Sequence, residues 1–318
     1  MATGPARVRS PAPRPVPDPL APYLPTRVSL ATQIALRVDE ARDRFGPDTR
    51  VQIEGGAFVV VDAERAPFFE QYASVVRRTV DTMAAGPFPD PLEEPVTVFV
   101  FRTPKAYVAF SRLRYAFDPG DDWAFYRRSR REIVADGTKG IGTLVHELIH
   151  PMIQRSWEDA PAWINEGVAS VFEAPVWSPD GKTMHGVRNW RYDGLVAAMS
   201  SPERGGQTRL DALFGMPDRE FLDVDEKDAE VRRDVQLWHY GIARYVCQWL
   251  DRMGPGLLWP FFAAYRDGYA EDPTGKAAFI RTVGIAPADA DAAWRAYVRS
   301  GAGAVAPSIP AGIPAHPR

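Results

Sequence analysis

Three residues in one short stretch of the sequence have the types and the spacing to bind a metal ion and to use it. They are His146, Glu147 and His150, which form the pattern H-E-x-x-H within T-L-V-H-E-L-I-H. On a helix, residues four apart lie on the same face, so both imidazoles can hold one ion. Glu147 lies one residue round from His146, and its carboxylate can reach a water on that ion. The apolar residues around them predict a buried helix and a site of low dielectric constant.

A second segment, P-A-W-I-N-E-G-V-A-S-V-F-E, begins at residue 161 and carries a further carboxylate, Glu166. The run N-E-G-x-A-S-x-F-E after an H-E-x-x-H helix resembles the gluzincin metallopeptidases, the clan of thermolysin-like and aminopeptidase-like enzymes. In that clan the Glu of N-E is the third zinc ligand. The resemblance therefore implies one Zn²⁺ per chain, bound by His146, His150 and Glu166. Two nitrogens and one carboxylate oxygen leave the fourth tetrahedral position for water, which is the catalytic arrangement.

The stretch W-H-Y-G-I-A-R-Y-V-C-Q-W-L at 238–250 resembles the gluzincin helix that carries a tyrosine facing the zinc. The resemblance implies that Tyr240 stabilises the oxyanion while Glu147 acts as the catalytic base. A phenol donor aimed at the developing charge contributes several kcal/mol to such a step. His239 is the alternative donor, and neighbouring helical residues diverge by about 100°, so only one of the two can face the metal.

The stretch R-R-E-I-V-A-D-G, which ends at residue 137, resembles the edge strand that precedes the metal helix in these peptidases. If Ile133–Ala135 forms an exposed strand edge, a peptide substrate can bind it by main-chain hydrogen bonds. The alternative is a strand that is paired on both sides inside the sheet. The sequence leaves both readings open.

Three departures from the gluzincin pattern change the expectations. The G-A-M-E-N motif of zinc aminopeptidases is absent, so the sequence does not indicate a dedicated site for a substrate N-terminus. Ser170 stands where thermolysin-like enzymes have an aspartate, and we expect Glu173 or another acceptor to support a zinc histidine. Pro151 directly follows His150. It cannot donate to the carbonyl of Glu147 and disfavours helical geometry before it, which predicts a kink or a tightened turn beyond the motif.

Hydrophobic periodicity predicts an α+β fold, with helices and a small mixed sheet in 27–139 and mainly helices in 140–300. The resemblance adds a zincin-like arrangement with an active-site cleft between these parts. Segments 1–26 and 301–318 are rich in Pro and Ala and are expected to be disordered. Strands are expected at 51–53, 58–61, 95–101 and 132–135. Helices are expected at 27–45, 67–83, 104–113, 141–155, 161–174, 228–252, 255–267, 274–283 and 287–299.

Composition narrows the function classes. The chain has 318 residues and a net charge of −3, so there is no basic field for nucleic acid. Its longest apolar stretches fall short of the roughly 18 residues that suggest a membrane span. The one cysteine, Cys247, rules out an internal disulfide framework and is expected to be a buried core residue. The N-terminus lacks the apolar segment of a signal peptide, which makes the cytoplasm the default expectation and secretion of a trimmed form the alternative.

These features lead to one expectation and two rivals. We expect a zinc metallopeptidase that hydrolyses a peptide or protein substrate through a water activated by Glu147. One rival is a zinc hydrolase of a non-peptide amide or ester. The other is a non-catalytic binding protein with a zincin fold, although binding alone does not require Glu147. Endo- or exo-action, cleavage preference and oligomeric state are left open by the sequence.

Overall fold

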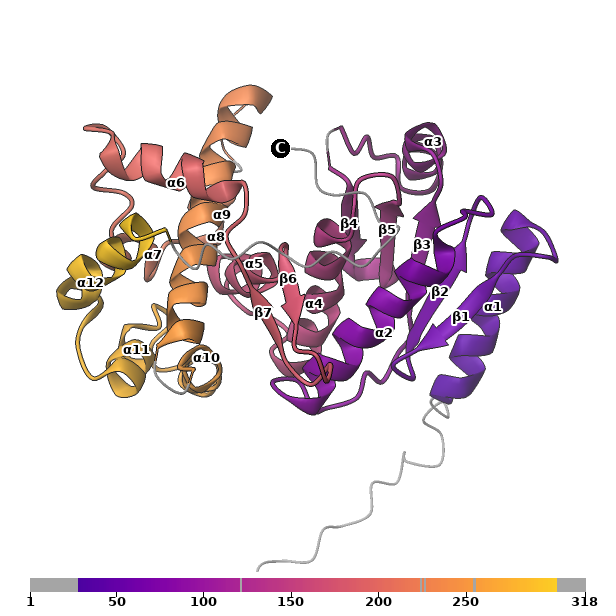
Figure 1. The fold of residues 1–318 in the computed structure, drawn as a ribbon, viewed down its shortest axis with the longest axis horizontal. Coiled ribbons are helices and arrows are strands. Elements are labelled where there is room, and N and C mark those ends of the chain that lie inside the picture. Colours follow the sequence, from indigo (N-terminus) through magenta and orange to yellow (C-terminus); the bar gives the residue numbers. More distant parts are fainter. Residues whose placement is uncertain (1–27, 121, 224, 226, 254–255, 302–318) are drawn as a thin grey trace, which may run out of the picture.

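The computed structural model describes residues 28–301, apart from 121, 224, 226 and 254–255. A sheet-bearing part and a helical part lie side by side, with helices α4 and α5 between them (Figure 1). The structure combines many helices with a mixed five-stranded sheet, which agrees with the predicted α+β class. The terminal segments that were expected to be disordered lie outside the described residues, apart from Gly301.

The five-stranded sheet has the order β1-β2-β3-β5-β4. Strands β2, β3 and β5 are parallel to one another, whereas β1 and β4 run antiparallel to their neighbours. The predicted hairpin at 51–61 is confirmed as β1 and β2. The strands are β1 (Val51–Glu54), β2 (Phe58–Asp62), β3 (Val96–Phe101), β4 (Ala124–Arg127) and β5 (Glu132–Asp136).

The reading of Ile133–Ala135 as an exposed edge is wrong. Strand β5 pairs with β3 on one side and with β4 on the other, and all of its residues are buried. Its apolar run is typical of a central strand that is covered on both faces. The edge strands of this sheet are β1 and β4, and the sequence analysis did not predict β4.

Helices cover both faces of the sheet, because alternate residues of each strand point to opposite sides. Val59 and Val61 of β2 pack with α1 (Leu30–Phe45) and α3 (Pro104–Tyr115). Phe58 and Val60 point the other way, toward a larger core. That core includes apolar residues of α2 (Phe69–Ala85) and α4 (Gly142–Ser156).

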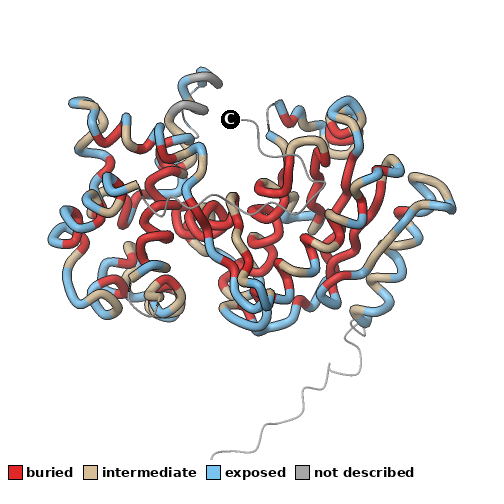
Figure 2. Tube along the Cα trace, in the orientation of Figure 1, coloured by how far each residue is buried: buried red, intermediate tan, exposed pale blue. Residues whose placement is uncertain are grey.

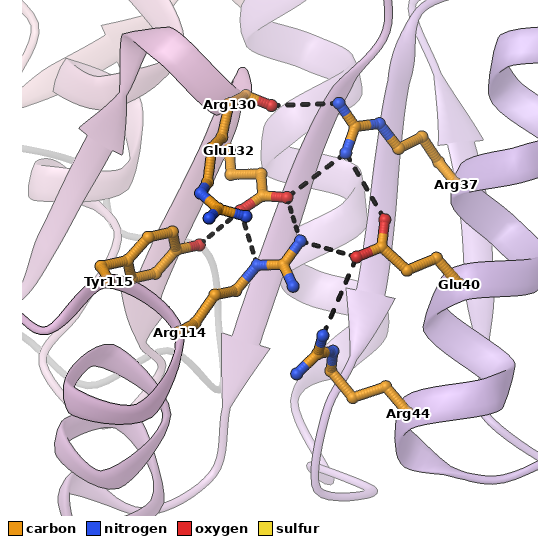
Figure 3. Close-up of polar contacts among 7 residues, drawn as sticks. All are labelled: Arg37, Glu40, Arg44, Arg114, Tyr115, Arg130 and Glu132. Atoms are coloured by element: carbon orange, nitrogen blue, oxygen red, sulfur yellow. Dashed lines mark hydrogen bonds and ion pairs between the residues drawn. The ribbon is translucent and has the colours of Figure 1, made fainter.

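A buried ion-pair network fastens α1 and α3 to β5 (Figure 3). Its centre is the carboxylate of Glu132, whose side chain is 1% exposed. Arg114 donates from Nε to Glu132 Oε2 over 2.8 Å, and the hydroxyl of Tyr115 donates to the same oxygen over 2.7 Å. Arg37 and Glu40 of α1 complete it, with Arg37 Nη1 3.3 Å from Glu132 Oε1. We call these five residues the Glu132 network.

The helical part surrounds α9, and the six helices predicted after residue 140 are confirmed with shifted ends. A 3₁₀ turn, Arg128–Arg130, follows β4. The hairpin β6–β7 and helices α6–α8 were not predicted, and of these only α6 is longer than four residues. The elements are α5 (Ala162–Val171), β6 (Pro175–Trp177), β7 (Met184–Gly186), α6 (Arg191–Ser200), α7 (Leu210–Leu213), α8 (Asp218–Phe221), α9 (Ala229–Arg252), α10 (Leu258–Asp267), α11 (Lys276–Val283) and α12 (Pro287–Arg299).

One hydrophobic core extends from the sheet face under α2 and α4 to helix α12. Figure 2 shows this core as a band of buried chain through both parts of the molecule. Cys247 of α9 lies within it and is fully buried, as expected. Within the described residues, no helix combines the length and the apolar character needed to cross a membrane.

Candidate metal centre

The side chains of His146, His150 and Glu166 converge on one point between α4 and α5. The two histidines lie one turn apart on α4, with ring centroids 4.7 Å apart, and Glu166 faces them from α5. Nε2 of His146 is 3.2 Å from Glu166 Oε2, and Nε2 of His150 is 3.8 Å from the same oxygen. One ligand atom from each residue lies within 4.8 Å of the others. The structure thus brings together the three residues that the sequence analysis selected as ligands.

Pro151 does not interrupt the metal helix. Helix α4 continues through Pro151 to Ser156, and His150 keeps its helical spacing from His146. Pro151 therefore removes one backbone hydrogen-bond donor from α4 but does not end the helix. The surrounding core holds the next turn in place. Met152 and Ile153 of that turn are buried.

Each histidine is supported through its other ring nitrogen. Nδ1 of His146 lies 3.3 Å from Glu173 Oε1 and 3.5 Å from the hydroxyl of Ser170. Nδ1 of His150 lies 3.1 Å from Asn165 Oδ1. A hydrogen bond at Nδ1 leaves Nε2 as the lone-pair nitrogen that can bind a metal, and it fixes the plane of the ring. The expected contact between Glu173 and a histidine is therefore present.

Glu173 is itself held by groups that the sequence analysis missed. Arg191 donates to it twice, from Nε to Oε2 over 2.8 Å and from Nη2 to Oε1 over 2.6 Å. Asn189 donates from Nδ2 to Oε2 over 2.8 Å. Burial alone would raise the pKa of Glu173, but Arg191 and His146 hold it well below its usual range. Glu173 is therefore a fixed anion that orients His146.

Glu147 lies in the same site without joining the converging ligand set. Its Oε2 is 3.9 Å from His150 Nε2, and its side chain is almost buried. Burial raises the pKa of the Glu147 carboxyl. A carboxylate with raised proton affinity, next to the place where a metal and its water would sit, has the position and basicity of a general base.

Tyr240 lines the pocket beside these residues, whereas His239 does not. The guanidinium of Arg191 lies 5.0 Å from the Tyr240 ring centroid. Burial raises the pKa of Tyr240 far above its usual value, so the phenol remains a proton donor. His239 points toward α8, where its Nδ1 donates to the carbonyl of Phe221 over 2.8 Å. Of the two candidate donors, only Tyr240 is in a position to reach a substrate in the pocket.

Two glycines allow the helices of the site to approach closely. A Cβ on Gly167 would lie 2.9 Å from both the carbonyl oxygen of Ala243 and the sulfur of Cys247 in α9. A Cβ on Gly142 would lie 2.1 Å from the carbonyl oxygen of Glu173. Such distances are too short for real carbon atoms, so only glycine fits at either position. The first glycine brings α5 against α9, and the second brings the start of α4 against the backbone of Glu173.

The site opens into a groove of about 920 Å³. Its floor is α4, and one wall is the edge strand β4 with the residues around it. The opposite wall includes Trp190, Arg191, Leu237 and Tyr240. Among the described strands, β4 pairs only with β5, so its second edge is not used by the sheet. The groove therefore combines converging ligands, a base, a phenol donor and a strand edge.

The donor set fits zinc. Two ligands held about 2.0–2.1 Å from a tetrahedral zinc ion lie about 3.3 Å apart, close to the distances from Glu166 to the two histidines. Two buried carboxylates (Glu147 and Glu173) and the partly buried Glu166 surround these histidines. Arg191 forms an ion pair with only one of them, Glu173, so a cation would stabilise the site. No protein-family model matches this chain, and no match was found among curated proteins.

Proposed function

We propose that this chain is a zinc-dependent metallopeptidase of the gluzincin type, with a zincin-like fold. The observation that carries the proposal is the convergence of His146, His150 and Glu166 in a groove that also holds Glu147. A structural zinc site would close all four positions with protein ligands, whereas three ligands leave one position for chemistry. A protein that only bound zinc would need the three ligands but would not need a base beside them.

The residues divide the work of peptide hydrolysis between them. Zinc, when bound, supplies Lewis-acid polarisation of the scissile carbonyl and makes a water more acidic. Glu147 accepts the proton of the attacking water and delivers it to the leaving amine. The hydroxyl of Tyr240 donates a hydrogen bond to the oxyanion of the tetrahedral intermediate. Glu173 and Asn165 hold the two imidazoles in their tautomers and orientations throughout.

The edge of β4 is proposed to bind the substrate main chain. An extended peptide can add to an unpaired strand edge through backbone hydrogen bonds, which do not depend on its side chains. Strand β4 lies beside the metal helix, and Tyr126 of this strand donates to Gln154 of α4 over 3.0 Å. A peptide on this edge would lie above the floor that carries the ligands. This proposal replaces the expectation that β5 binds the substrate.

The test combines metal analysis with peptide cleavage. Protein purified without added metal is expected to contain about one zinc per chain, and it should cleave members of a mixed peptide library. A chelator should remove both the zinc and the cleavage, and zinc should restore them. Persistent absence of zinc after zinc is supplied would overturn the proposal. Hydrolysis of amide or ester compounds but of no peptide would keep the zinc site and replace the substrate class.

A further inference from the structure

The groove extends well beyond the metal ligands along α4. Its floor is made by residues that recur every three or four positions, which places them on one helix face. At 1.5 Å per residue, the stretch from the first to the last of them is about 21 Å long. An extended peptide rises about 3.3 Å per residue, so about six substrate residues fit. The residues of α4 and its C-cap that line the groove are Thr143, His146, Glu147, His150, Ile153, Gln154 and Trp157.

The wall formed by β4 and its flanking residues runs along the groove in the same direction as its floor, α4. The carbonyl of Trp123 accepts from the N–H of Asp136, shortly before α4 begins. Further along, Tyr126 bonds Gln154, and Arg128 Nη2 lies 3.3 Å from Asp159 Oδ1, just after α4 ends. The four-residue edge of β4 is therefore beside α4, and the residues just before and after it continue the wall along the groove. A peptide on this edge would pass the metal site with residues on both sides of it.

The two ends of the groove are lined by large aromatic residues. Trp157 lies at the end of α4. Trp190 lies at the other end, since its neighbour Arg191 holds Glu173, whose backbone packs on the start of α4. Trp157 is 8% exposed and packs against Phe262 and Tyr265, so it forms a buried wall at its end, whereas Trp190 is 39% exposed and offers surface to a ligand.

Enzymes that remove terminal residues need a charged group to hold the substrate terminus. The charged side chains of this groove outside the ligand set are mostly engaged with one another. Arg191 is paired with Glu173, and Arg128 lies 3.5 Å from Glu158. Asp122 also lines the groove and has an interaction partner of its own, and its variant enters the experiment below.

Two side chains of the wall opposite β4 expose unusual apolar area. Trp190 is 39% exposed and Leu237 is 45% exposed, although large apolar residues are mostly buried elsewhere in the described chain. Both line the groove, with Leu237 one helical turn before Tyr240 on α9. Exposed apolar side chains that gather in a concave site are typical of ligand binding. We call this pair the apolar rim.

We propose that the protein is an endopeptidase that cleaves within an extended, unfolded polypeptide segment, and that the apolar rim binds a large apolar side chain of that segment. The inference rests on the proposed zinc peptidase function and adds to it the mode of cleavage and the side-chain preference. The β4 edge binds the main chain, and the rim selects where along the chain the scissile bond is placed.

The mode of cleavage is tested with peptides blocked at both ends. An eight-residue peptide with an acetylated N-terminus, an amidated C-terminus and a central leucine or phenylalanine should be cut as fast as its unblocked form. The rate should fall by more than tenfold when the peptide is shortened below about six residues, because the groove is then only partly filled. Asp122→Asn should change the rates on the blocked and the unblocked form by the same factor.

Cleavage that requires a free amine or a free carboxylate would overturn endo-action, as would a loss in Asp122→Asn confined to peptides with a free amine. Either result would leave the peptidase function intact. By contrast, zinc-loaded protein that cleaves no peptide, blocked or free, would overturn the proposed function itself. The two failures are therefore distinguishable in one set of assays.

The rim is tested with Trp190→Ala and Leu237→Ser. Each should lower kcat/KM about tenfold, mainly through KM, on the peptide with a large apolar central residue. On the same peptide with alanine at that position, both variants should match the unchanged protein. Leu113→Ser is the matched control, since Leu113 is 83% exposed on α3 and lies outside the groove. Unchanged kinetics in both rim variants, or an equal loss on both peptides, would overturn the assignment.

Discussion

Two buried glutamates of this protein are held by arginine in nearly the same way, yet their surroundings differ. Glu132 receives hydrogen bonds from Arg114 and Tyr115, and Glu173 receives them from Arg191 and Asn189. In the Glu132 network the contacts of Glu132 join β5 to α1 and α3 (Figure 3). The network also lines a pocket of about 380 Å³ together with Glu94, but no histidine is among the described residues that line it.

Around Glu173 the pattern changes. Its carboxylate also contacts His146, whose other ring nitrogen converges with His150 and Glu166 on the groove. The same kind of ion pair therefore fastens helices to the sheet in one place and orients a candidate metal ligand in the other. The two regions differ in what the carboxylate contacts besides its arginine, which is a histidine only in the case of Glu173. Burial and ion pairing alone therefore do not identify a functional site.

The largest effects are expected for Glu147 and Glu166 of the groove, in contrast to Glu132. Glu147→Gln keeps the shape and removes the base, so the rate should fall on the order of 10²–10⁴-fold with zinc still bound. Glu166→Ala removes a ligand, so zinc affinity should fall together with the rate. Zinc content and turnover are measured on both variants in one buffer. Full activity in Glu147→Gln would contradict the mechanism, and full zinc affinity in Glu166→Ala would contradict the ligand assignment.

Glu132→Gln tests whether the Glu132 network contributes to stability and not to activity. It leaves the guanidinium of Arg114, whose side chain is 6% exposed, without its buried partner. Breaking such a pair costs about 3–5 kcal/mol, so the free energy of unfolding should fall by about that amount. Zinc content and the rate per folded molecule should not change. Urea unfolding gives the stability, and Glu40→Gln is the control, because Glu40 is 40% exposed and its pairs contribute about 1 kcal/mol or less.

Tyr240→Phe sharpens the assignment of the oxyanion donor. The variant keeps the ring under Arg191 and removes only the hydroxyl, so kcat should fall on the order of a hundredfold with zinc retained. His239→Ala is the comparison, because His239 bonds the carbonyl of Phe221 and lies outside the groove. A small effect in Tyr240→Phe together with a large loss in His239→Ala would move the role to the histidine.

Glu173→Gln is the closest counterpart of Glu132→Gln and should have a different readout. The amide keeps one contact to His146 and loses the charge that Arg191 balances, so zinc affinity should fall about 10–100-fold. Competition with a chelator of known affinity measures this loss. If Glu173→Gln instead only lowered stability, as Glu132→Gln is expected to do, the distinction between the two regions would not hold.

The sequence predicted the parts of the structure that local spacing determines. The helices follow from a period of 3.6 residues, and His146 and His150 share a face because they are four residues apart. Glu166 was reached through the resemblance, and the structure brings it to the histidines. The strand assignment for 132–135 was right, but periodicity cannot show which strand lies at the edge. The unbroken apolar run Ile133–Ala135 was the available signal for a central strand.

The groups missed by the sequence analysis are those that depend on tertiary folding. Arg191 reaches Glu173 across the β6–β7 hairpin, and no local pattern links two residues in such a connection. The four residues of β4 are too short a run for a reliable period. The role of Asn165 could have been predicted, since it precedes Glu166 in the N-E pair. Both residues are on α5, from which Asn165 contacts His150.

Substitution of Gly167 is expected to inactivate the site, although this residue takes no part in the chemistry. It touches neither the proposed ion nor the substrate, yet a single methyl group there would act as a wedge between α5 and α9. That wedge would change the spacing between Glu166 and Tyr240 while leaving every reacting group chemically intact. In a library of all single substitutions selected for activity, position 167 should tolerate change as poorly as the ligands themselves. Its neighbour Val168 is a buried core residue and should accept small apolar replacements.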